Sequence, residues 1–217
     1  MRSGMGVKVC WARCRGAGRS DLESGIQLSS IDVIAQALEP VMPAVGRMSS
    51  PDGAVTLMLG DIADAPAAAE QMGAERWERL LRDHHVLVER LVAHHDGQVV
   101  KFEGDGFLAS FNSAHGGLHA GIELQRTFAG LGAESEGLAM RLGLHSGFVI
   151  ANPEQLLGRN VVLAARIAAT AKAGEILVSS TLKQYTETDQ SFSFEPRGEY
   201  HFKGLLGEHE VFSVPWR

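Results

Sequence analysis

The stretch Lys101-Phe102-Glu103-Gly104-Asp105-Gly106 lies between two runs of residues that favour β-strands, 98–100 and 107–111. This arrangement predicts a β-hairpin with its turn at Gly104-Asp105-Gly106. Because glycine tolerates backbone conformations that other residues avoid, the two glycines permit a tight turn that presents the Asp105 carboxylate at its tip. An ordinary surface turn is the alternative interpretation of the same residues.

A second carboxylate upstream favours a functional role for this hairpin. Residues 55–62 form an apolar run typical of a β-strand, with Asp61 near its end. If that strand lies beside the hairpin, Asp61 and Asp105 converge. Two carboxylates together with substrate phosphates are the ligands that a pair of Mg²⁺ ions takes in phosphoryl transfer. The sequence therefore predicts a metal site that needs no histidine.

The remaining elements follow from the spacing of apolar residues and of residues that end helices. The core order is β-α-β-β-α-β, a ferredoxin-like α+β fold with additional strands, for which we expect one antiparallel sheet with helices on one face. We expect helices at 31–38, 67–96, 114–130, 158–173 and 181–185, and strands at 55–62, 98–100, 107–111, 139–145, 148–151, 175–179, 192–194, 200–203 and 210–214, with a turn at 146–147.

Length and composition set the domain organisation. A chain of 217 residues, 45% of them hydrophobic, is long enough to bury a full core. We expect one domain at 48–217 that follows an extension at 1–47, and we expect the extension to be disordered apart from its one short helix. A weak targeting signal within the extension, and a true start of the protein at Met48, are alternatives.

Charge and cysteine usage exclude several classes of protein. The net charge of −6 argues against a nucleic-acid-binding surface. No run approaches the roughly 18 consecutive apolar residues needed to cross a bilayer, so we expect no membrane association. Cys10 and Cys14 lack the companions of a zinc site, and we expect a cytoplasmic protein without disulfides. No metal role is predicted for the histidines, among them His84-His85 and His94-His95, because no third ligand or carboxylate matches them in sequence.

Six short motifs follow one another between residues 59 and 204, and their combination is more specific than any one of them. With these motifs, residues 53–215 resemble the catalytic domain of the class III nucleotidyl cyclases, the adenylate and guanylate cyclase family. The resemblance implies that family's catalytic fold and the attack of a ribose 3′-oxygen on the α-phosphorus of a nucleoside triphosphate, with release of pyrophosphate. The motifs are Leu59-Gly60-Asp61-Ile62, Lys101 to Gly106, Met140 to Gly147, Gly158 to Arg166, Gly174 to Ser179 and Phe202-Lys203-Gly204.

The resemblance implies a role for each matching residue. Asp61 and Asp105, with Ile62 beside the first, would hold two Mg²⁺ or Mn²⁺ ions per site, and Arg141 and Lys203 would contact the triphosphate of ATP. A strand-borne arginine such as Arg141 can instead serve only as the ion-pair partner of an acid.

Three further residues would complete such a site. Lys101 and Gln155 would read the edge of the purine, and Arg166 would stabilise the charge that develops on the α-phosphate and the leaving group. A solvated position on a helix is the alternative for Arg166. The family implies a head-to-tail homodimer in which the metal aspartates of one chain face Lys101, Arg166 and Lys203 of the other.

The sequence departs from the family pattern at three places. Asp64-Ala65-Pro66 replaces a phosphate-binding turn, which removes one N–H donor and adds a negative charge. Val162 stands where the family has an asparagine on the same helix face as Arg166, and Asn160, six residues before that arginine, is a doubtful substitute. Gln155 stands where adenylate cyclases have an aspartate, and its amide is less selective between purines.

These observations predict an adenylate cyclase that makes cyclic AMP from ATP, with activity reduced by the departures. The alternative is a cyclase-like domain without useful turnover that serves as a nucleotide-binding or dimerisation module. GTP or another nucleotide as substrate is a third interpretation. Lys101 disfavours GTP, because the guanylate cyclases of this family tend to carry glutamate at that position.

Overall fold

A seven-stranded sheet forms the centre of the computed structural model, which describes residues 30–36, 53–132, 137–148 and 153–217. The strands lie in the order β2-β3-β1-β4-β5-β7-β6, so the first strand is flanked by the hairpin on one side and by β4 on the other. Their bounds are β1 Ala54–Ile62, β2 Gly97–Glu103, β3 Gly106–Phe111, β4 Met140–Phe148, β5 Ile176–Ser179, β6 Glu195–Tyr200 and β7 His209–Ser213.

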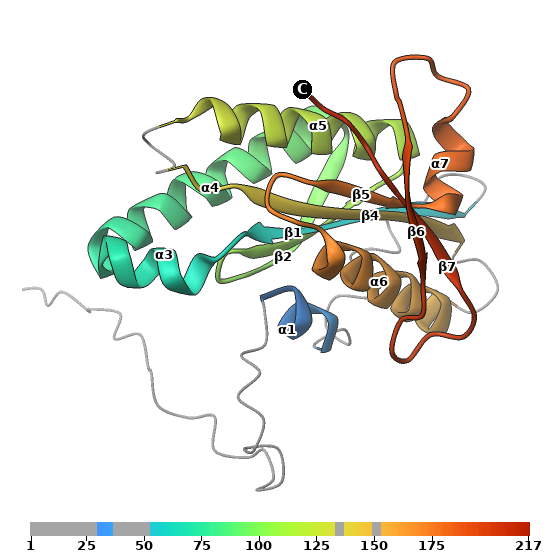
Figure 1. Cartoon of the computed structure of the whole chain (residues 1–217), viewed down its shortest axis with the longest axis horizontal. Helices are drawn as coiled ribbons and strands as arrows, with labels where there is room; N and C mark the ends of the chain where they lie inside the picture. Colours follow the sequence, from blue (N-terminus) through green and yellow to red (C-terminus); the bar gives the residue numbers. More distant parts are fainter. Residues whose placement is uncertain (1–29, 37–52, 133–136, 149–152) are drawn as a thin grey trace, which may run out of the picture.

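Helices cover both faces of the sheet (Figure 1). One face carries α4 and α5, and its core includes Phe107, Phe111 and Leu144. The other face carries α6 and the short α1, which share a second apolar cluster with β1 and β3. The helices are α1 Ser30–Gln36, α3 Ala65–Met72, α4 Ala74–His94, α5 Ala114–Gly130, α6 Pro153–Thr170 and α7 Ser180–Thr186.

The predicted α+β class and βαββαβ core are confirmed, but two expectations about the sheet are wrong. The pair β4 and β5 is parallel, not antiparallel. Parallel neighbours need a crossover connection, and here α6 supplies it. That crossover lies on the face opposite α4 and α5, which is why the helices do not all lie on one face.

Three local expectations are also wrong. The long helix predicted from residue 67 is broken at Gly73, whose φ of 78° and ψ of 160° end α3 and begin α4. The turn predicted at Ser146-Gly147 is continuous strand, because Ser146 pairs with Thr56 across β1 and their hydroxyl groups lie 2.8 Å apart. Residues 192–194 form no strand, and β6 begins at Glu195 instead. The part of the predicted strand at 149–151 lies outside the described residues.

Two glycines allow the close packing that positions the end of β1. A Cβ on Gly143 would lie 2.2 Å from the backbone nitrogen of Ala168, so α6 packs directly on the backbone of β4. A Cβ on Gly60 would lie 2.4 Å from a methyl group of Leu142. Since real Cβ atoms do not approach backbone atoms this closely, only glycine fits at position 143, whereas a side chain at position 60 would require Leu142 to move. Among the described residues, no helix is both long and apolar enough to cross a membrane.

Candidate functional site

Asp61 and Asp105 lie in one cavity, as the sequence predicted. Asp61 is at the end of β1 and Asp105 is in the turn between β2 and β3; their exposed fractions are 1% and 8%. Pairing of β1 with β3 brings the two elements together. The cavity has a volume of about 460 Å³ and is lined by Ser30, Asp61, Ile62, Asp64, Ala65, Pro66, Ala69, Trp77, Asp105 and Arg141.

Asp61 makes a two-pronged ion pair with Arg141. The Nε and Nη2 atoms of Arg141 donate to the two carboxylate oxygens at 2.8 and 2.5 Å. The pair follows from the sheet register, in which Asp61 of β1 stands opposite Arg141 of β4. Hydrogen bonding to Asp61 raises the pKa of Arg141 above its already high value, so the guanidinium stays charged. Arg141 is thus ion-paired with Asp61 in this structure, and its expected contact with a triphosphate stays a prediction.

The Asp105 carboxylate is held by groups from two parts of the chain. Its Oδ1 accepts a hydrogen bond of 2.5 Å from the Ser30 hydroxyl of α1, and its Oδ2 accepts one of 3.0 Å from the backbone N–H of Ile62. Ile62, expected beside the metals, thus links the end of β1 to the hairpin turn. The contact with Ser30 was not foreseen, since 75 positions separate it from Asp105 and its only recognised signal was that of a helix start.

Two histidines of α4 hold the backbone of the same turn. The Nε2 of His84 lies 3.1 Å from the carbonyl oxygen of Asp105, and the Nε2 of His85 lies 2.8 Å from that of Gly104. Burial lowers the pKa of His84 to about 4, so its ring is neutral at pH 7 and Nε2–H donates to the carbonyl. This adjacent pair, for which the sequence predicted no metal role, therefore positions the Asp105 turn.

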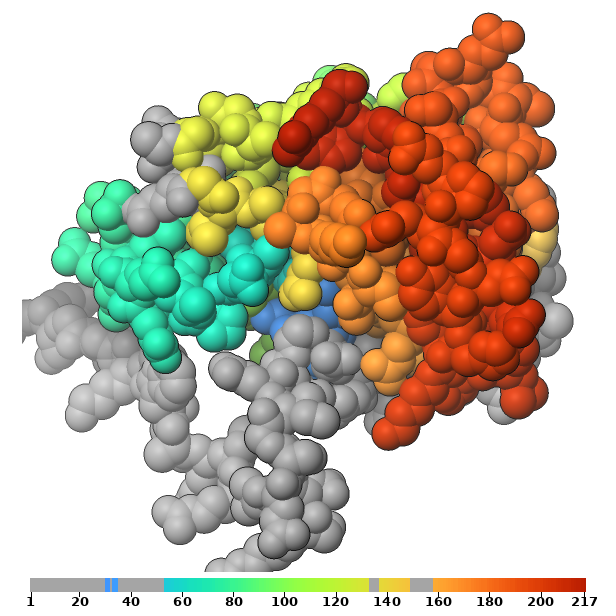
Figure 2. Space-filling model, viewed as in Figure 1, coloured from blue at the N-terminus to red at the C-terminus, as the bar shows by residue number. Residues whose placement is uncertain are grey.

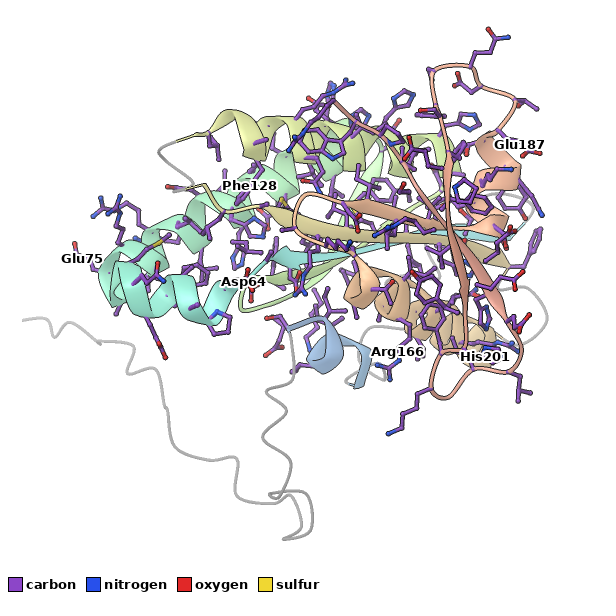
Figure 3. The ribbon with its side chains drawn as sticks, viewed as in Figure 1. Asp64, Glu75, Phe128, Arg166, Glu187 and His201 are labelled. Atoms are coloured by element: carbon purple, nitrogen blue, oxygen red, sulfur yellow. The ribbon has the colours of Figure 1, made fainter. Side chains whose placement is uncertain are left out.

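The other predicted site residues do not line this cavity. Lys101 lies on β2, where its Nζ is 3.1 Å from Glu103, and Lys203 is exposed in the connection between β6 and β7. Arg166 is partly exposed on α6, on the lower side of the molecule in Figure 3, away from Asp64. The side chain of Gln155, in the first turns of α6, is outside the described part of the structure. The roles of these residues stay predictions.

Asn160 is engaged in a network that connects α6, β4 and α7. Its Oδ1 lies 3.2 Å from Nε2 of His145, and its Nδ2 donates to the Phe148 carbonyl at 3.2 Å. Nδ1 of His145 lies 2.8 Å from the Ser179 hydroxyl, which also caps α7. A Cβ on Gly147 would lie 2.6 Å from the Asn160 amide. Both ends of the Asn160 amide are therefore hydrogen-bonded to β4, while Val162 is partly exposed on the same helix.

The turn after β1 carries the first departure from the family pattern. Asp64 is exposed, has a φ of 56° in the left-handed region, and precedes α3 without a side-chain cap. Pro66 lies in the first turn of α3, where it contributes no N–H group. Both residues line the cavity, so the wall that would meet a triphosphate has one negative charge more and one donor fewer.

The donors in the cavity fit a hard divalent cation. Carboxylate oxygens are the ligands that Mg²⁺ and Mn²⁺ prefer, and Asp61 and Asp105 face one cavity with low exposure. The Arg141 guanidinium supplies the positive charge that balances Asp61 in this structure. A cation bound to Asp61 would replace the Arg141 guanidinium as the positive charge beside this carboxylate.

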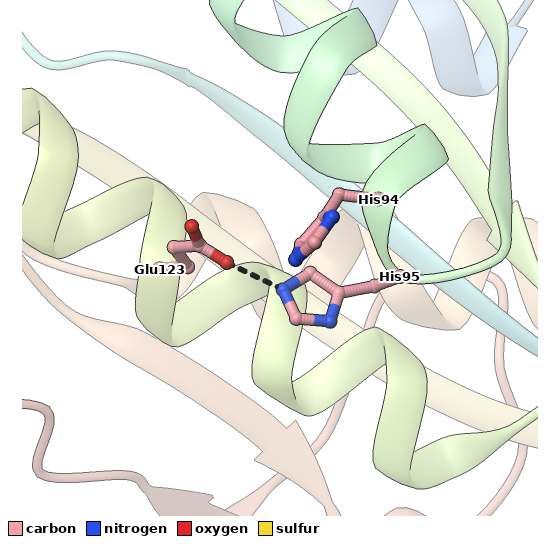
Figure 4. A group of neighbouring side chains, drawn as sticks. All are labelled: His94, His95 and Glu123. Atoms are coloured by element: carbon pink, nitrogen blue, oxygen red, sulfur yellow. Dashed lines mark hydrogen bonds and ion pairs between the residues drawn. The ribbon is translucent and has the colours of Figure 1, made fainter.

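A second cluster of possible metal ligands joins α4 to α5 (Figure 4). Ligand atoms of His94, His95 and Glu123 lie within 4.8 Å of one another. The expectation that no carboxylate matches the histidines is therefore wrong. However, Nε2 of His95 and Oε2 of Glu123 are 2.6 Å apart, which is a hydrogen bond. Two ligands of one tetrahedral zinc ion at bond lengths near 2 Å would lie about 3.3 Å apart, so this pair links the two helices.

Known proteins share both the sequence pattern and the fold. The profile of the adenylate and guanylate cyclase catalytic domain matches residues 48–214. The chain belongs to this family. A putative adenylate cyclase 3 of Rhizobium meliloti is 29% identical over 144 residues, which is 65% of this chain and 23% of that protein. The serine/threonine-protein kinase pkn2 of Myxococcus xanthus is 31% identical over 125 residues, 56% of this chain and 15% of its own. The chain thus spans less than a quarter of either relative.

Solved cyclase structures share the fold of this cyclase-family domain. The adenylyl cyclase CyaB of P. aeruginosa superposes with a TM-score of 0.67 at 21% identity, over 75% of this chain and 93% of that one. The catalytic core of a rhodopsin-guanylyl cyclase with converted specificity, in complex with ATPalphaS, gives 0.66 at 22% identity, over 75% and 96%. These likenesses show the class III cyclase catalytic fold.

Proposed function

We propose that this domain is an adenylate cyclase that converts ATP to cyclic AMP and pyrophosphate with Mg²⁺ or Mn²⁺, at a site completed by a second copy of the chain. The observation that carries the proposal is the convergence of Asp61 and Asp105 in one cavity with Arg141 beside them. Two buried carboxylates and a guanidinium in one cavity suit two cations and a polyphosphate.

The residues of this chain would act in distinct ways. Asp61 and Asp105 would hold the ions, which supply charge stabilisation for the attacking and leaving oxygens. Arg141 would exchange its partner, releasing Asp61 to the ion and turning its guanidinium to the phosphates. His84 would keep the Asp105 turn in place through its hydrogen bond to the Asp105 carbonyl oxygen.

The division of the other residues supports a shared site. Lys101, Arg166 and Lys203 do not line the cavity of the two aspartates. If they act on the same nucleotide, they act from a second chain, as in a head-to-tail homodimer with two equivalent sites. Lys101 and Gln155 would then contact the adenine, and Arg166 the α-phosphate. We further propose a cytoplasmic location, consistent with the use of ATP.

The second candidate function is a nucleotide-binding or dimerisation module with no useful turnover. Val162 favours it, because the donor that the family places beside Arg166 is absent at that position. Asp64 and Pro66 favour it too, since they make the cavity wall less suited to a triphosphate.

The deciding experiment measures cyclic nucleotide formation by the purified chain with Mn²⁺ and either ATP or GTP. The proposal expects cyclic AMP in excess of cyclic GMP, and loss of both in Asp61→Asn, which keeps the shape of the side chain but removes its charge. Asp83→Asn, at an exposed position of α4, is the matched control and should behave as wild type. A folded, dimeric protein with no product from either nucleotide would support the binding module.

A further inference from the structure

The helix α1 precedes the rest of the fold in sequence, yet its first residue lies in the cavity of the two aspartates. Ser30 lines that cavity and donates its hydroxyl hydrogen to Oδ1 of Asp105 at 2.5 Å. A Cβ placed on Gly106 would lie 2.6 Å from the Cβ of Ser30, so the start of α1 packs directly against the hairpin turn. The hairpin glycine thus makes room for α1.

Two isoleucines fix α1 to the face of the sheet. Ile31 and Ile34 both have exposed fractions of 0%. They belong to the apolar cluster that α1 shares with Val55, Leu57, Leu59, Leu108, Val161, Ala164, Ala165 and Ala168. Figure 2 shows the blue atoms of α1 in the hollow between the cyan segment after β1 and the orange segment of the C-terminal half. Burial of these side chains is what keeps α1 in place.

The position of α1 conflicts with the proposed use of the site. Oδ1 of Asp105 accepts a hydrogen bond from Ser30 and Oδ2 accepts one from the Ile62 N–H group, so a cation on Oδ1 would compete with the Ser30 hydroxyl hydrogen. In addition, α1 contacts β2 and α6, the elements that carry Lys101 and Arg166. It therefore covers the sheet face that those residues border.

We propose that α1 is an intramolecular cap that holds the metal site closed, and that its release is required for full activity. The proposal rests on the proposed function, because it names how that same site is regulated. The closed state pairs Asp105 with Ser30 and buries Ile31 and Ile34; the open state frees Asp105 for the cation and clears the face between β2 and α6. The two states share the sheet, since α1 is not a strand of it.

The test compares four versions of the full chain: wild type, Ser30→Ala, Ile34→Asp, and the control Val86→Asp, which places the same charge at an α4 position that is 64% exposed. Mn²⁺ affinity is measured directly from the electron paramagnetic resonance of free Mn²⁺, and cyclic AMP formation separately. Hydrogen exchange of the α1 amides reports whether the cap has opened.

If α1 caps the site, Ile34→Asp should lower the Mn²⁺ concentration for half-saturation by about tenfold or more. The apparent Mn²⁺ affinity is proportional to the fraction of molecules in the open state, and the variant raises that fraction. Ser30→Ala, which removes one hydrogen bond, should lower it by about two- to tenfold. Turnover at low Mn²⁺ should rise in both variants, and α1 should exchange faster in Ile34→Asp. Val86→Asp should match wild type. If Ile34→Asp does not fold, Ile34→Ala provides the same comparison with a milder change.

Unchanged Mn²⁺ affinity in Ser30→Ala and in the Ile34 variant would overturn the cap. Weaker Mn²⁺ binding in Ser30→Ala would also overturn it, since the hydroxyl would then be a ligand of the ion. Tighter Mn²⁺ binding without cyclic nucleotide formation in any version would support the cap while refuting the proposed enzyme. If every version forms cyclic AMP and no α1 variant changes the rate, the proposed enzyme is supported and the cap is overturned.

Discussion

Both carboxylate oxygens of Asp61 accept hydrogen bonds from Arg141, at 2.8 and 2.5 Å, across neighbouring strands of the sheet. Asp61 is 1% exposed, whereas a quarter of the Arg141 side chain is exposed. The arginine can therefore move towards the cavity more easily than the aspartate. If a cation binds here, this asymmetry would make Arg141 the residue that moves away from the ion pair.

Replacing Arg141 by alanine should reveal whether a cation takes its place. The variant leaves the buried Asp61 charge without a partner, and we expect a loss of roughly 2–3 kcal/mol in the free energy of unfolding, below the about 3–5 kcal/mol of a fully buried pair because the arginine is partly exposed. Added Mn²⁺ should restore more stability to Arg141→Ala than it adds to wild type. Thermal unfolding with and without Mn²⁺ measures both effects.

Arg197→Ala is the matched control for that comparison. Arg197 pairs with Glu175 at 2.8 Å, and the two side chains are 29% and 25% exposed. Its removal should also cost stability, but Mn²⁺ should not compensate the loss, since neither residue lines the cavity. Equal responses to Mn²⁺ in the two variants would show that the ion does not bind at Asp61.

A mixing experiment tests the shared site. Asp105→Ala and Arg166→Ala chains should each be inactive as homodimers, because each lacks one necessary group in both sites. A mixed dimer has one site with both groups intact, so mixing equal amounts should recover about a quarter of wild-type activity, given random exchange of chains and full activity of that site. Size-exclusion chromatography confirms that both variants remain dimers. No recovery in folded, exchanging dimers would argue that each chain carries its own complete site.

The convergence of Asp61 and Asp105 was predictable because it depends on local signals. A strand ending in an acid, a hairpin with glycines around an acid, and the βαββαβ order suffice to place both carboxylates at one end of adjacent strands. The pairing of Arg141 with Asp61 was recognised only as an alternative, because it depends on the register of β1 against β4. A register is set by packing along a whole strand and not by the two residues concerned.

Contacts that depend on tertiary packing were not predictable. The bond between Ser30 and Asp105 joins an isolated short helix to a distant turn, and periodicity says nothing about where such a helix docks. The role of Asn160 requires that α6 lie on β4 at the distance that Gly143 allows. Ser146-Gly147 looked like a turn because serine and glycine favour turns, but pairing of these two residues with Thr56 and Val55 of β1 overrides that local preference.

Two buried histidines should make stability depend on pH. Burial lowers the pKa of His84 and of His145 to about 4, below the ordinary value of 6.5. Between these values the unfolded chain binds protons that the folded chain does not, so stability present above pH 6.5 is lost as the pH falls towards 4. We expect each histidine to contribute a loss of about 2 kcal/mol between about pH 7 and pH 5.

Urea unfolding at both pH values measures this loss. His84→Gln and His145→Gln should each flatten the pH dependence by about 2 kcal/mol, whatever their effect on stability at neutral pH. The control is His201→Gln, because the His201 side chain is 75% exposed (Figure 3). A pH dependence unchanged by either buried substitution would mean that other groups cause it.

The residue at position 162 should limit turnover. Val162 is partly exposed on α6, four positions before Arg166 and thus on the same side of the helix, so an asparagine there would place a donor beside Arg166. Asn160 cannot substitute, because its amide groups are engaged with His145 and Phe148. One preorganised donor is typically worth about 10²- to 10³-fold in rate, and we expect Val162→Asn to raise kcat by about 10-fold or more. Steady-state assays with Mn²⁺ and ATP measure kcat of Val162→Asn beside that of Val162→Leu, which adds bulk without a donor and should remain near wild type. Asn160→Ala should mainly reduce stability, by about 1–3 kcal/mol, since it removes the Asn160 partner of the buried His145 ring. A kcat unchanged by Val162→Asn but abolished by Asn160→Ala in a stable protein would reverse the two assignments.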